Sequence, residues 1–262
     1  MSAVQPFAER HRAAIDSLGK RLKAFLVDPD EDNLHDMRTA IRRADASMSA
    51  LPKRFRGRRK TKTLSGRLED LMRQSAKVRD LDTVRARLSA YPPSGAHDLL
   101  LPRIEKSRRR QLRSTVSLAS SIRKLSSLCP DESDLDEKKV RKRVDKVAKK
   151  LKSRVDRTLP VVLAEPDKTV VLHSLRKDCK RLRYTLELVP EHGEGSKLVK
   201  TMRSWQDLLG EVRDGDVAIG YLEGVARSAA VDEILKAERN RRRRDYEKFV
   251  RACNEAPLRR TA

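Results

Sequence analysis

The sequence predicts an all-α protein built from two related helical halves. Apolar residues recur at spacings of three and four along most of the chain, which is the period of an amphipathic helix. Hydrophobic and charged residues each make up 38% of the chain, and the ten glycines and eleven prolines cluster between the periodic stretches. A basic helical pattern also occurs twice, 138 residues apart. These observations favour long helices and an internal duplication over broad buried sheets.

The periodic stretches define the expected helices and the boundary between the halves. The helices are expected over about 3–27, 31–51, 58–89, 97–127, 135–159, 168–189, 195–224 and 229–253. A break at Cys129–Ser133 separates a first half of about 3–128 from a second half of about 135–253, and 254–262 forms a short tail. We therefore expect one domain over 1–262, made of two pseudo-symmetric antiparallel four-helix bundles packed together. One continuous bundle without separable halves is the alternative.

Two similar segments mark the starts of corresponding helices. Asp28-Pro29-Asp30 precedes the helix at 31–51, and Glu165-Pro166-Asp167 precedes the helix at 168–189. An Asp that follows a proline break can accept hydrogen bonds from the exposed N–H groups of the first helical turn. The aspartate that follows the proline in each segment, Asp30 in the first and Asp167 in the second, is therefore predicted to cap its helix.

The repeated pattern places a row of cations beside an apolar stripe. The first row contains His35, Arg38 and Arg42, and the second contains His173, Arg176 and Lys180. The first stripe contains Leu34, Met37, Ile41, Ala44, Met48 and Leu51, and the second contains Leu172, Leu175, Cys179, Leu182, Leu186 and Val189. Each row lies on one side of its helix and spans about 10 Å. A rigid row of that length suits an extended polyanion better than a single small anion.

The similarity continues beyond these helices. The segment Val78–Asp82 corresponds to Val212–Asp216 with an offset of 134, which matches Arg79 with Arg213. The segment Glu105–Arg110 corresponds to Glu238–Arg243 with an offset of 133. That second offset matches Arg109 and Arg110 with Arg242 and Arg243. The aspartates of the first pair of segments, which are Asp80, Asp82, Asp214 and Asp216, are expected to orient nearby arginines.

Composition indicates the kind of partner. The formal net charge is +23, the pI is near 10.4 and aromatic residues make up 3%. This charge is compatible with nucleic acid, inorganic polyphosphate, other polyanions or an anionic membrane surface as the partner, and it predicts salt-sensitive binding to any of them. The scarcity of aromatic residues argues against stacking on single-stranded bases. With no apolar signal segment or membrane-spanning stretch, we expect a cytoplasmic protein.

The sequence gives little support to an enzyme. It has no Gly-rich phosphate loop of the GxxxxGK type, no Glu-x-Glu-x-Lys segment and no nucleophile in a recognisable setting. Three distant cysteines, Cys129, Cys179 and Cys253, offer neither a metal-ligand spacing nor a disulfide framework. We therefore predict no catalysis, no cofactor and no metal site.

The motif His-x-x-Arg-x-x-x-Arg/Lys-Arg, present in each half, resembles that of the CHAD family, the conserved histidine α-helical domain. It ends at Arg43 in the first half and at Arg181 in the second, and the second half continues with Arg183-Tyr184 and with Trp205–Gly210. The resemblance covers roughly residues 5–253. It implies two pseudo-symmetric bundles around a basic channel, and binding of inorganic polyphosphate. The first half departs from the pattern at Asp45 and Ala46, which shortens its row.

The pattern and the resemblance together predict the binding residues. They are His35, Arg38, Arg42, Arg43, Arg79, Arg109, Arg110, His173, Arg176, Lys177, Lys180, Arg181, Arg183, Arg213, Arg242 and Arg243. The two histidines either contact the ligand or fix a neighbouring helix. The alternative function is a nucleic-acid-binding or ribosome-associated helical protein. A third hypothesis, compatible with the first, is a scaffold that recruits granule proteins to polyphosphate granules.

Overall fold

Helices form all the regular structure in the part of the chain that the computed structural model describes, residues 7–122, 125–130, 135–188, 196–226 and 228–255. The first half contains α1 (Phe7–Val27), α2 (Glu31–Ala50), α3 (Lys53–Arg56), α4 (Arg59–Leu88) and α5 (Gly95–Ser120), followed by a 3-10 turn at Leu125–Leu128. The second half contains α6 (Glu137–Ala164), α7 (Thr169–Leu186), α8 (Lys197–Glu223) and α9 (Ala229–Glu255). The all-α prediction is confirmed for these residues.

The expected helices differ from the observed ones mainly at their ends. The short α3 was not expected, and α5 ends at Ser120 instead of continuing to residue 127. The end predicted at residue 159 is wrong, because α6 continues through Pro160 to Ala164. Proline removes one backbone donor and crowds the preceding turn. Beyond it Val162 is fully buried in an apolar core, and this packing offsets the local cost.

One of the two predicted helix caps is present. Asp30 caps α2, since its side chain accepts a hydrogen bond from the backbone N–H of Asn33 at 2.7 Å. At the second start signal the cap position falls on Lys168, which makes no side-chain capping bond, and Asp167 is exposed. The similar segments therefore mark both helix starts, but the prediction of a capping aspartate holds only for α2.

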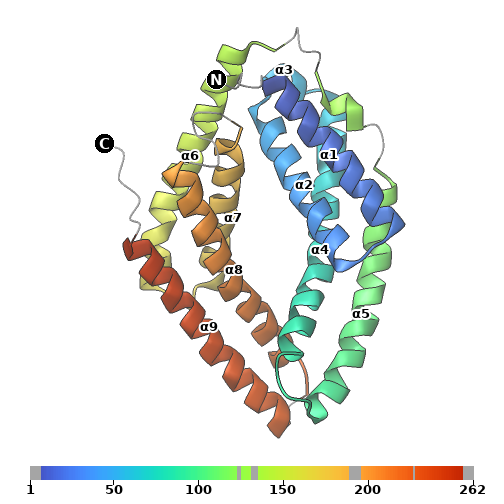
Figure 1. The fold of residues 1–262 in the computed structure, drawn as a ribbon, viewed down its shortest axis with the longest axis vertical. Coiled ribbons are helices and arrows are strands. Elements are labelled where there is room, and N and C mark those ends of the chain that lie inside the picture. The colour runs from blue at the N-terminus through green and yellow to red at the C-terminus, as the bar shows by residue number, and fades with distance from the viewer. Residues whose placement is uncertain (1–6, 123–124, 131–134, 189–195, 227, 256–262) are drawn as a thin grey trace.

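Each half has its own apolar core. The first core draws on α1, α2, α4 and the end of α5, and the second draws on α6, α7, α8 and α9. These two groups of helices lie on opposite sides of the molecule in Figure 1. Both apolar stripes predicted from the sequence are buried, except for Val189, which lies outside the described residues. The rows of cations beside these stripes are therefore held on rigid helices.

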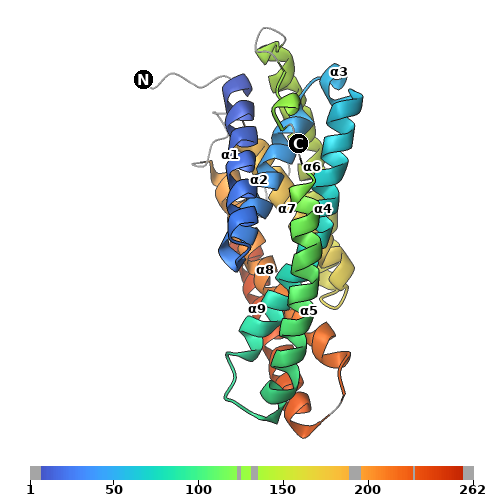
Figure 2. The same cartoon turned by 90° about the vertical axis from the view of Figure 1, so that its right-hand side faces the viewer.

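Two smaller apolar clusters join the halves at opposite ends. At one end α4 and α5 pack against α8 and α9, and a buried ion pair joins Arg87 Nε to Glu238 Oε2 at 2.7 Å. At the other end Phe55 of α3 and the end of α2 pack against Val140 and Val144 of α6. Between these junctions α2 packs on α7, and α4 on α8. Figure 2 views the molecule from the side of α1 and α5.

Candidate anion-binding site

Helices of both halves contribute to a group of cations that we call the central cluster. It consists of Arg38 and Arg42 from α2, Arg176 and Lys180 from α7, and Arg213 from α8. All five side chains are half-buried. After burial, repulsion from Arg42 and Arg213 lowers the pKa of Arg38 and Arg176, and repulsion from the arginines lowers that of Lys180, so the members of the cluster lie near one another. The structure thus brings together the centres of both predicted rows.

Burial and mutual repulsion both act against the charged forms of these groups. Burial, followed by repulsion from Arg176, Arg42 and Arg38, lowers the pKa of Lys180 to about 6. Burial, with repulsion from Arg42 next, lowers the pKa of Arg38 to about 9. At neutral pH the guanidinium groups remain charged, whereas the Lys180 amine is largely neutral. The site is therefore strongly positive and holds one amine that can take up a proton.

Carboxylates offset only part of this charge. Arg213 forms an ion pair with Asp80 of α4, which links the two halves, and its Nη1 lies 3.6 Å from Asp214 Oδ1. Asp207, which is exposed, raises the pKa of Arg176 as the smallest of several influences. Even with Lys180 neutral, the four arginines of the central cluster outnumber these three carboxylates. The cluster consequently retains an excess of positive charge that an anion can neutralise.

The other two aspartates of the repeated segments hold arginines of the outer helices. Asp82 accepts a hydrogen bond from Arg108 Nε at 2.5 Å, and Asp216 accepts one from Arg242 Nε at 2.7 Å. In both pairs the residues are 26 positions apart. The expectation that these aspartates orient arginines is confirmed.

These ion pairs correct the alignment of the two halves. Arg108 and Arg242 hold equivalent partners, and they are 134 residues apart. The offset of 134 found for Val78–Asp82 therefore also applies to Glu105–Arg110, and the offset of 133 predicted for that segment is wrong by one residue. Arg109 is exposed and pairs with Glu105 on its own helix, and Arg110 is exposed beside it. Arg108 was missed by sequence reasoning, although the constant spacing from the aspartate carried the signal.

The two histidines lie in different surroundings. His173 Nε2 is 3.0 Å from Asp216 Oδ2, and the same carboxylate holds Arg242, which also donates to the Pro166 carbonyl at 2.7 Å. This chain of contacts ties α7 to α8 and α9. His35 is exposed, and partial burial, followed by repulsion from Arg42, lowers its pKa. Of the two readings left open by the sequence, His173 has the contacts of a residue that fixes a neighbouring helix.

Arg183 does not extend the second row as predicted. Its side chain is only 7% exposed. It donates from Nε to Gln206 at 3.2 Å and from Nη1 to Glu187 at 2.8 Å, and its guanidinium stacks on the Tyr184 ring at 4.2 Å. Tyr184 in turn lies in hydrogen-bonding contact with Arg42. Arg183 is therefore engaged within the protein, and it supports the central cluster through an aromatic neighbour.

Two glycines of α8 make room for arginines. A Cβ atom on Gly210 would lie 3.4 Å from Arg176 Nη2, which is a van der Waals contact, so this guanidinium lies directly over α8 at Gly210. A Cβ atom on Gly215 would lie 3.0 Å from Cβ of Arg242, which indicates a close approach of α8 and α9. Sequence reasoning included Gly210 in a motif but did not assign it this role.

The remaining predicted residues lie around the cluster or away from it. Arg79 is half-buried and forms an ion pair with Glu31. Exposed side chains near the predicted rows belong to Arg43 of α2 and to Lys177 and Arg181 of α7. Arg243 is exposed on α9. The structure therefore separates an inner group of half-buried cations from an outer group in contact with solvent.

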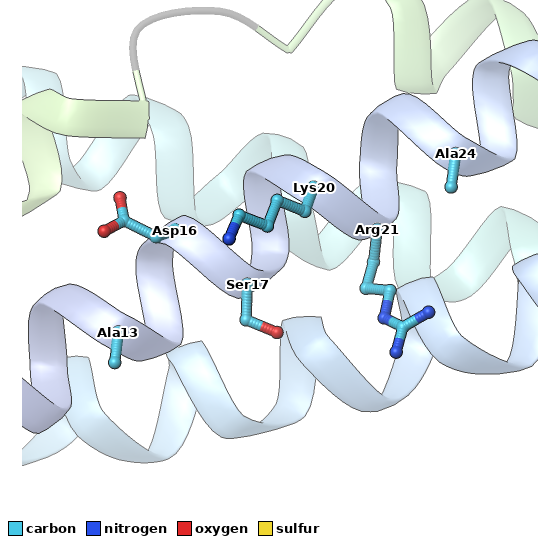
Figure 3. Close-up of a pocket in the computed structure, with 6 residues that line it drawn as sticks. All are labelled: Ala13, Asp16, Ser17, Lys20, Arg21 and Ala24. Atoms are coloured by element: carbon cyan, nitrogen blue, oxygen red, sulfur yellow. The ribbon is translucent and has the colours of Figure 1, made fainter.

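A shallow hollow on α1 is separate from this site. Figure 3 shows its lining, which consists of Ala13, Asp16, Ser17, Lys20, Arg21 and Ala24. Arg21 pairs with Asp36 of α2 at 2.8 Å. All six residues lie on one helix and their charges are of both signs, so the hollow lacks the convergent cations of the central cluster. Within the described residues, no three His, Cys, Asp or Glu side chains gather as a metal site requires.

Comparison with known proteins identifies the family. The CHAD domain family matches residues 9–223, and the chain therefore belongs to it, as the sequence motif predicts. The fold is similar to the CHAD domain from the plant Ricinus communis, at 18% identity and a TM-score of 0.69, over 97% of this chain and 91% of that one. It is also similar to PptA from Streptomyces chartreusis, at 17% identity and a TM-score of 0.66, over 96% of this chain and 99% of that one. No curated protein matches the chain. None of the described helices is both long and apolar enough to cross a membrane.

Proposed function

We propose that this protein binds inorganic polyphosphate in the central cluster. The observation that carries the proposal is the convergence of five half-buried basic side chains from both halves, whose four arginines outnumber the carboxylates beside them. Like charges held together in a medium of low dielectric raise the energy of the unliganded protein. A chain of phosphates between them relieves this repulsion and accepts hydrogen bonds from the guanidinium groups.

The shape of the site favours a thin polymer over a duplex. Arg38 and Arg42 are one helical turn apart, as are Arg176 and Lys180, so each helix offers cations about 6 Å apart along its axis. These side chains are half-buried between helices, where the wide surface of a nucleic-acid duplex cannot follow them. A linear phosphate chain carries its charges on a much narrower backbone. Duplex binding is therefore left to the exposed basic surface, as a weaker and salt-sensitive second function.

We assign the predicted residues to three groups. The proposed contact residues are Arg38, Arg42, Arg176, Lys180 and Arg213, with His35, Arg43, Arg79, Lys177 and Arg181 at the margin. Arg183, His173 and Arg242 are proposed to support the site through the contacts described above. Ligand contact by Arg109, Arg110 and Arg243 stays a prediction from the sequence.

The equal spacing of the Asp82–Arg108 and Asp216–Arg242 pairs supports a second part of the proposal, a duplicated architecture. We infer that the halves are pseudo-symmetric four-helix units that together form one domain. Binding is proposed to be non-catalytic, because Asp80 and Asp214, the carboxylates nearest the cluster, are engaged with Arg213. Neither is left as a general base. Recruitment of granule proteins remains compatible with such a binding module.

The test compares polymers and matched charge variants. Long-chain polyphosphate should displace duplex DNA and RNA from the protein at equal phosphate concentration and near-physiological salt. Replacing Arg176 and Lys180 by Gln should weaken polyphosphate binding about 10- to 100-fold, as expected for the loss of charge-assisted contacts. The control replaces Lys23 and Lys236, two exposed lysines on α1 and α9, by Gln and removes the same formal charge. Equal losses in both double variants, or equal competition by DNA, would contradict the proposal.

A further inference from the structure

Two arginines from different halves meet at the C-terminal end of α2. Arg56 of α3 donates through Nε to the Leu51 carbonyl at 2.9 Å, and Arg143 of α6 donates through Nε to the Ser49 carbonyl at 3.0 Å. Both side chains are half-buried. After burial, repulsion from Arg143 is the next cause that lowers the pKa of Arg56, so the two guanidinium groups lie near each other. Because each arginine is held through Nε, its two terminal nitrogens remain as further hydrogen-bond donors.

Helix capping explains one of these arginines but not the pair. The last carbonyls of a helix carry partial negative charge, and a nearby cation is stabilising. A second cation at the same place adds repulsion between the two guanidinium groups. An oxyanion between them would remove this repulsion, and the planar fork of each arginine suits phosphate oxygens.

The segment around Arg56 is also basic, and stacking on an aromatic ring restricts two of its arginine side chains. The guanidinium groups of Arg54 and Arg58 stack on the Phe55 ring at 5.0 and 4.4 Å, and Phe55 itself is buried. Such stacking restricts long side chains without neutralising them. The central cluster does not include this segment.

A row of lysines extends from the arginine pair along α6. The exposed residues Lys142, Lys146, Lys149 and Lys150 cover about 12 Å of the helix axis. Among the residues that the structure describes, these four form no ion pair. Asp145 is the exposed carboxylate within this stretch. Lysines three and four positions apart on one helix repel each other, so this face also gains from an anionic partner.

We propose that Arg56 and Arg143 form a second phosphate-binding site, which holds a segment of polyphosphate that extends beyond the central cluster. The inference rests on the proposed function and adds to it a second point of attachment. Arg42 of the central cluster and the Ser49 carbonyl are seven residues apart on α2, or about 10 Å along its axis. A long chain can reach both sites at once, whereas a very short one fills a single site. Attachment at two points raises affinity through the high effective concentration of the tethered segment.

The experiment separates the two sites by polymer length. The variant carries Arg56→Gln and Arg143→Gln, and the control carries Arg113→Gln and Arg244→Gln, two exposed arginines of α5 and α9. The probes are long-chain polyphosphate and tripolyphosphate. The variant should lose about tenfold in affinity for the long chain and keep its affinity for tripolyphosphate in the central cluster. The control should keep both affinities close to those of the wild-type protein.

The outcomes also separate this site from the function on which it rests. If the wild-type protein binds neither polyphosphate, the proposed function itself fails. If it binds the long chain and the Gln variant binds equally well, or the control loses as much, only the second site is overturned. A larger loss of duplex DNA binding than of polyphosphate binding would assign the pair to nucleic acid instead. If the Gln variant loses helicity, a variant with Arg56→Lys and Arg143→Lys replaces it. Lysine keeps the positive charges but lacks the planar guanidinium fork. Full affinity of this Lys variant for long-chain polyphosphate would overturn the site.

Discussion

Lys180 should couple polyphosphate binding to proton uptake. In the free protein its pKa is lowered to about 6, first by burial and then by repulsion from the arginines around it. A phosphate chain placed among these groups supplies the missing negative charge and favours the protonated amine. The pKa should therefore rise on binding toward its ordinary value of 10.5, and each bound site should take up close to one proton near pH 7.5.

The sign and size of the effect follow from this shift. One linked proton changes the binding free energy by about 1.4 kcal/mol, or tenfold in affinity, for each pH unit. Affinity should fall as pH rises from about 6.5 to about 8.5, by up to tenfold per unit. The ligand-free protein should show the opposite trend. Above pH 6 the unfolded chain holds this proton more tightly than the folded chain does, so the free energy of unfolding rises with pH.

Two substitutions of Lys180 isolate this group. Lys180→Met removes the amine and keeps the length of the side chain, so binding should be weaker and nearly independent of pH between 7 and 9. Lys180→Arg keeps a cation that does not titrate, so binding should stay strong and lose its pH dependence. Calorimetry in two buffers of different ionisation enthalpy, with long chains to dilute the titrating chain ends, gives the number of protons taken up.

Several results would refute this reasoning. Wild-type binding without proton uptake at pH 7.5 would show that Lys180 is already charged or lies outside the site. A wild-type pH slope in Lys180→Arg would assign the linked proton to another group. His35 is the natural candidate, because its pKa is also lowered in the free protein and binding would raise it. If Lys180 is the linked group, His35→Gln should leave the slope between pH 7 and 9 unchanged.

Two further predictions test the supporting contacts. Asp216→Ala should lower the free energy of unfolding by about 3 kcal/mol in denaturant titrations, because it strips Arg242 and His173 of their shared carboxylate while leaving the central cluster in place; an unchanged stability would contradict this role. Gly210→Ala and Gly220→Ala, both on α8, should each add up to about 1 kcal/mol of stability through helix propensity. Only the first should weaken polyphosphate binding, since a Cβ on Gly210 would contact the Arg176 guanidinium at 3.4 Å and one on Gly220 meets nothing within 4 Å. Equal affinities for the two glycine variants would show that the position of Arg176 does not depend on Gly210.

The helices were predictable because local and tertiary preferences agree along most of this chain. The apolar stripe of α2 is buried as its period predicts, and the α2 and α4 boundaries fall within a residue or so of those expected. The failures occur where long-range packing overrides a local signal. Pro160 marks a helix end on sequence grounds, but burial of Val162 keeps α6 helical beyond it. Asp167 ends a start signal similar to the one that ends at Asp30, but its side chain does not cap α7.

The site was predictable in its residue types and not in its partners. The spacing of Arg38 and Arg176 on their helices places both beside an apolar stripe, and the structure brings both into the central cluster. Periodicity could not show that Arg183, one residue after the buried Leu182, is held by Gln206 and Glu187. Nor could it show that Lys180 is surrounded by arginines of both halves, since this depends on how α2 and α7 pack. Pairwise contacts between the two halves therefore decide which cations of the repeated motif can meet a ligand.

The junctions at the two ends of the molecule explain how the cluster persists without a ligand. Repulsion among the central cations pushes α2 from α7, but the halves are also held by the buried Arg87–Glu238 pair at one end and by apolar contacts of Phe55 with α6 at the other. The Arg213–Asp80 pair adds a direct link beside the cluster. The fold therefore fixes the cations in place in the free protein. On the proposed function, the free energy released when polyphosphate neutralises them would go into binding, and little would be spent on ordering side chains. Because the helices are held in place, we expect the free protein to relieve the repulsion among these cations by releasing a proton from Lys180. We do not expect the helices to move apart.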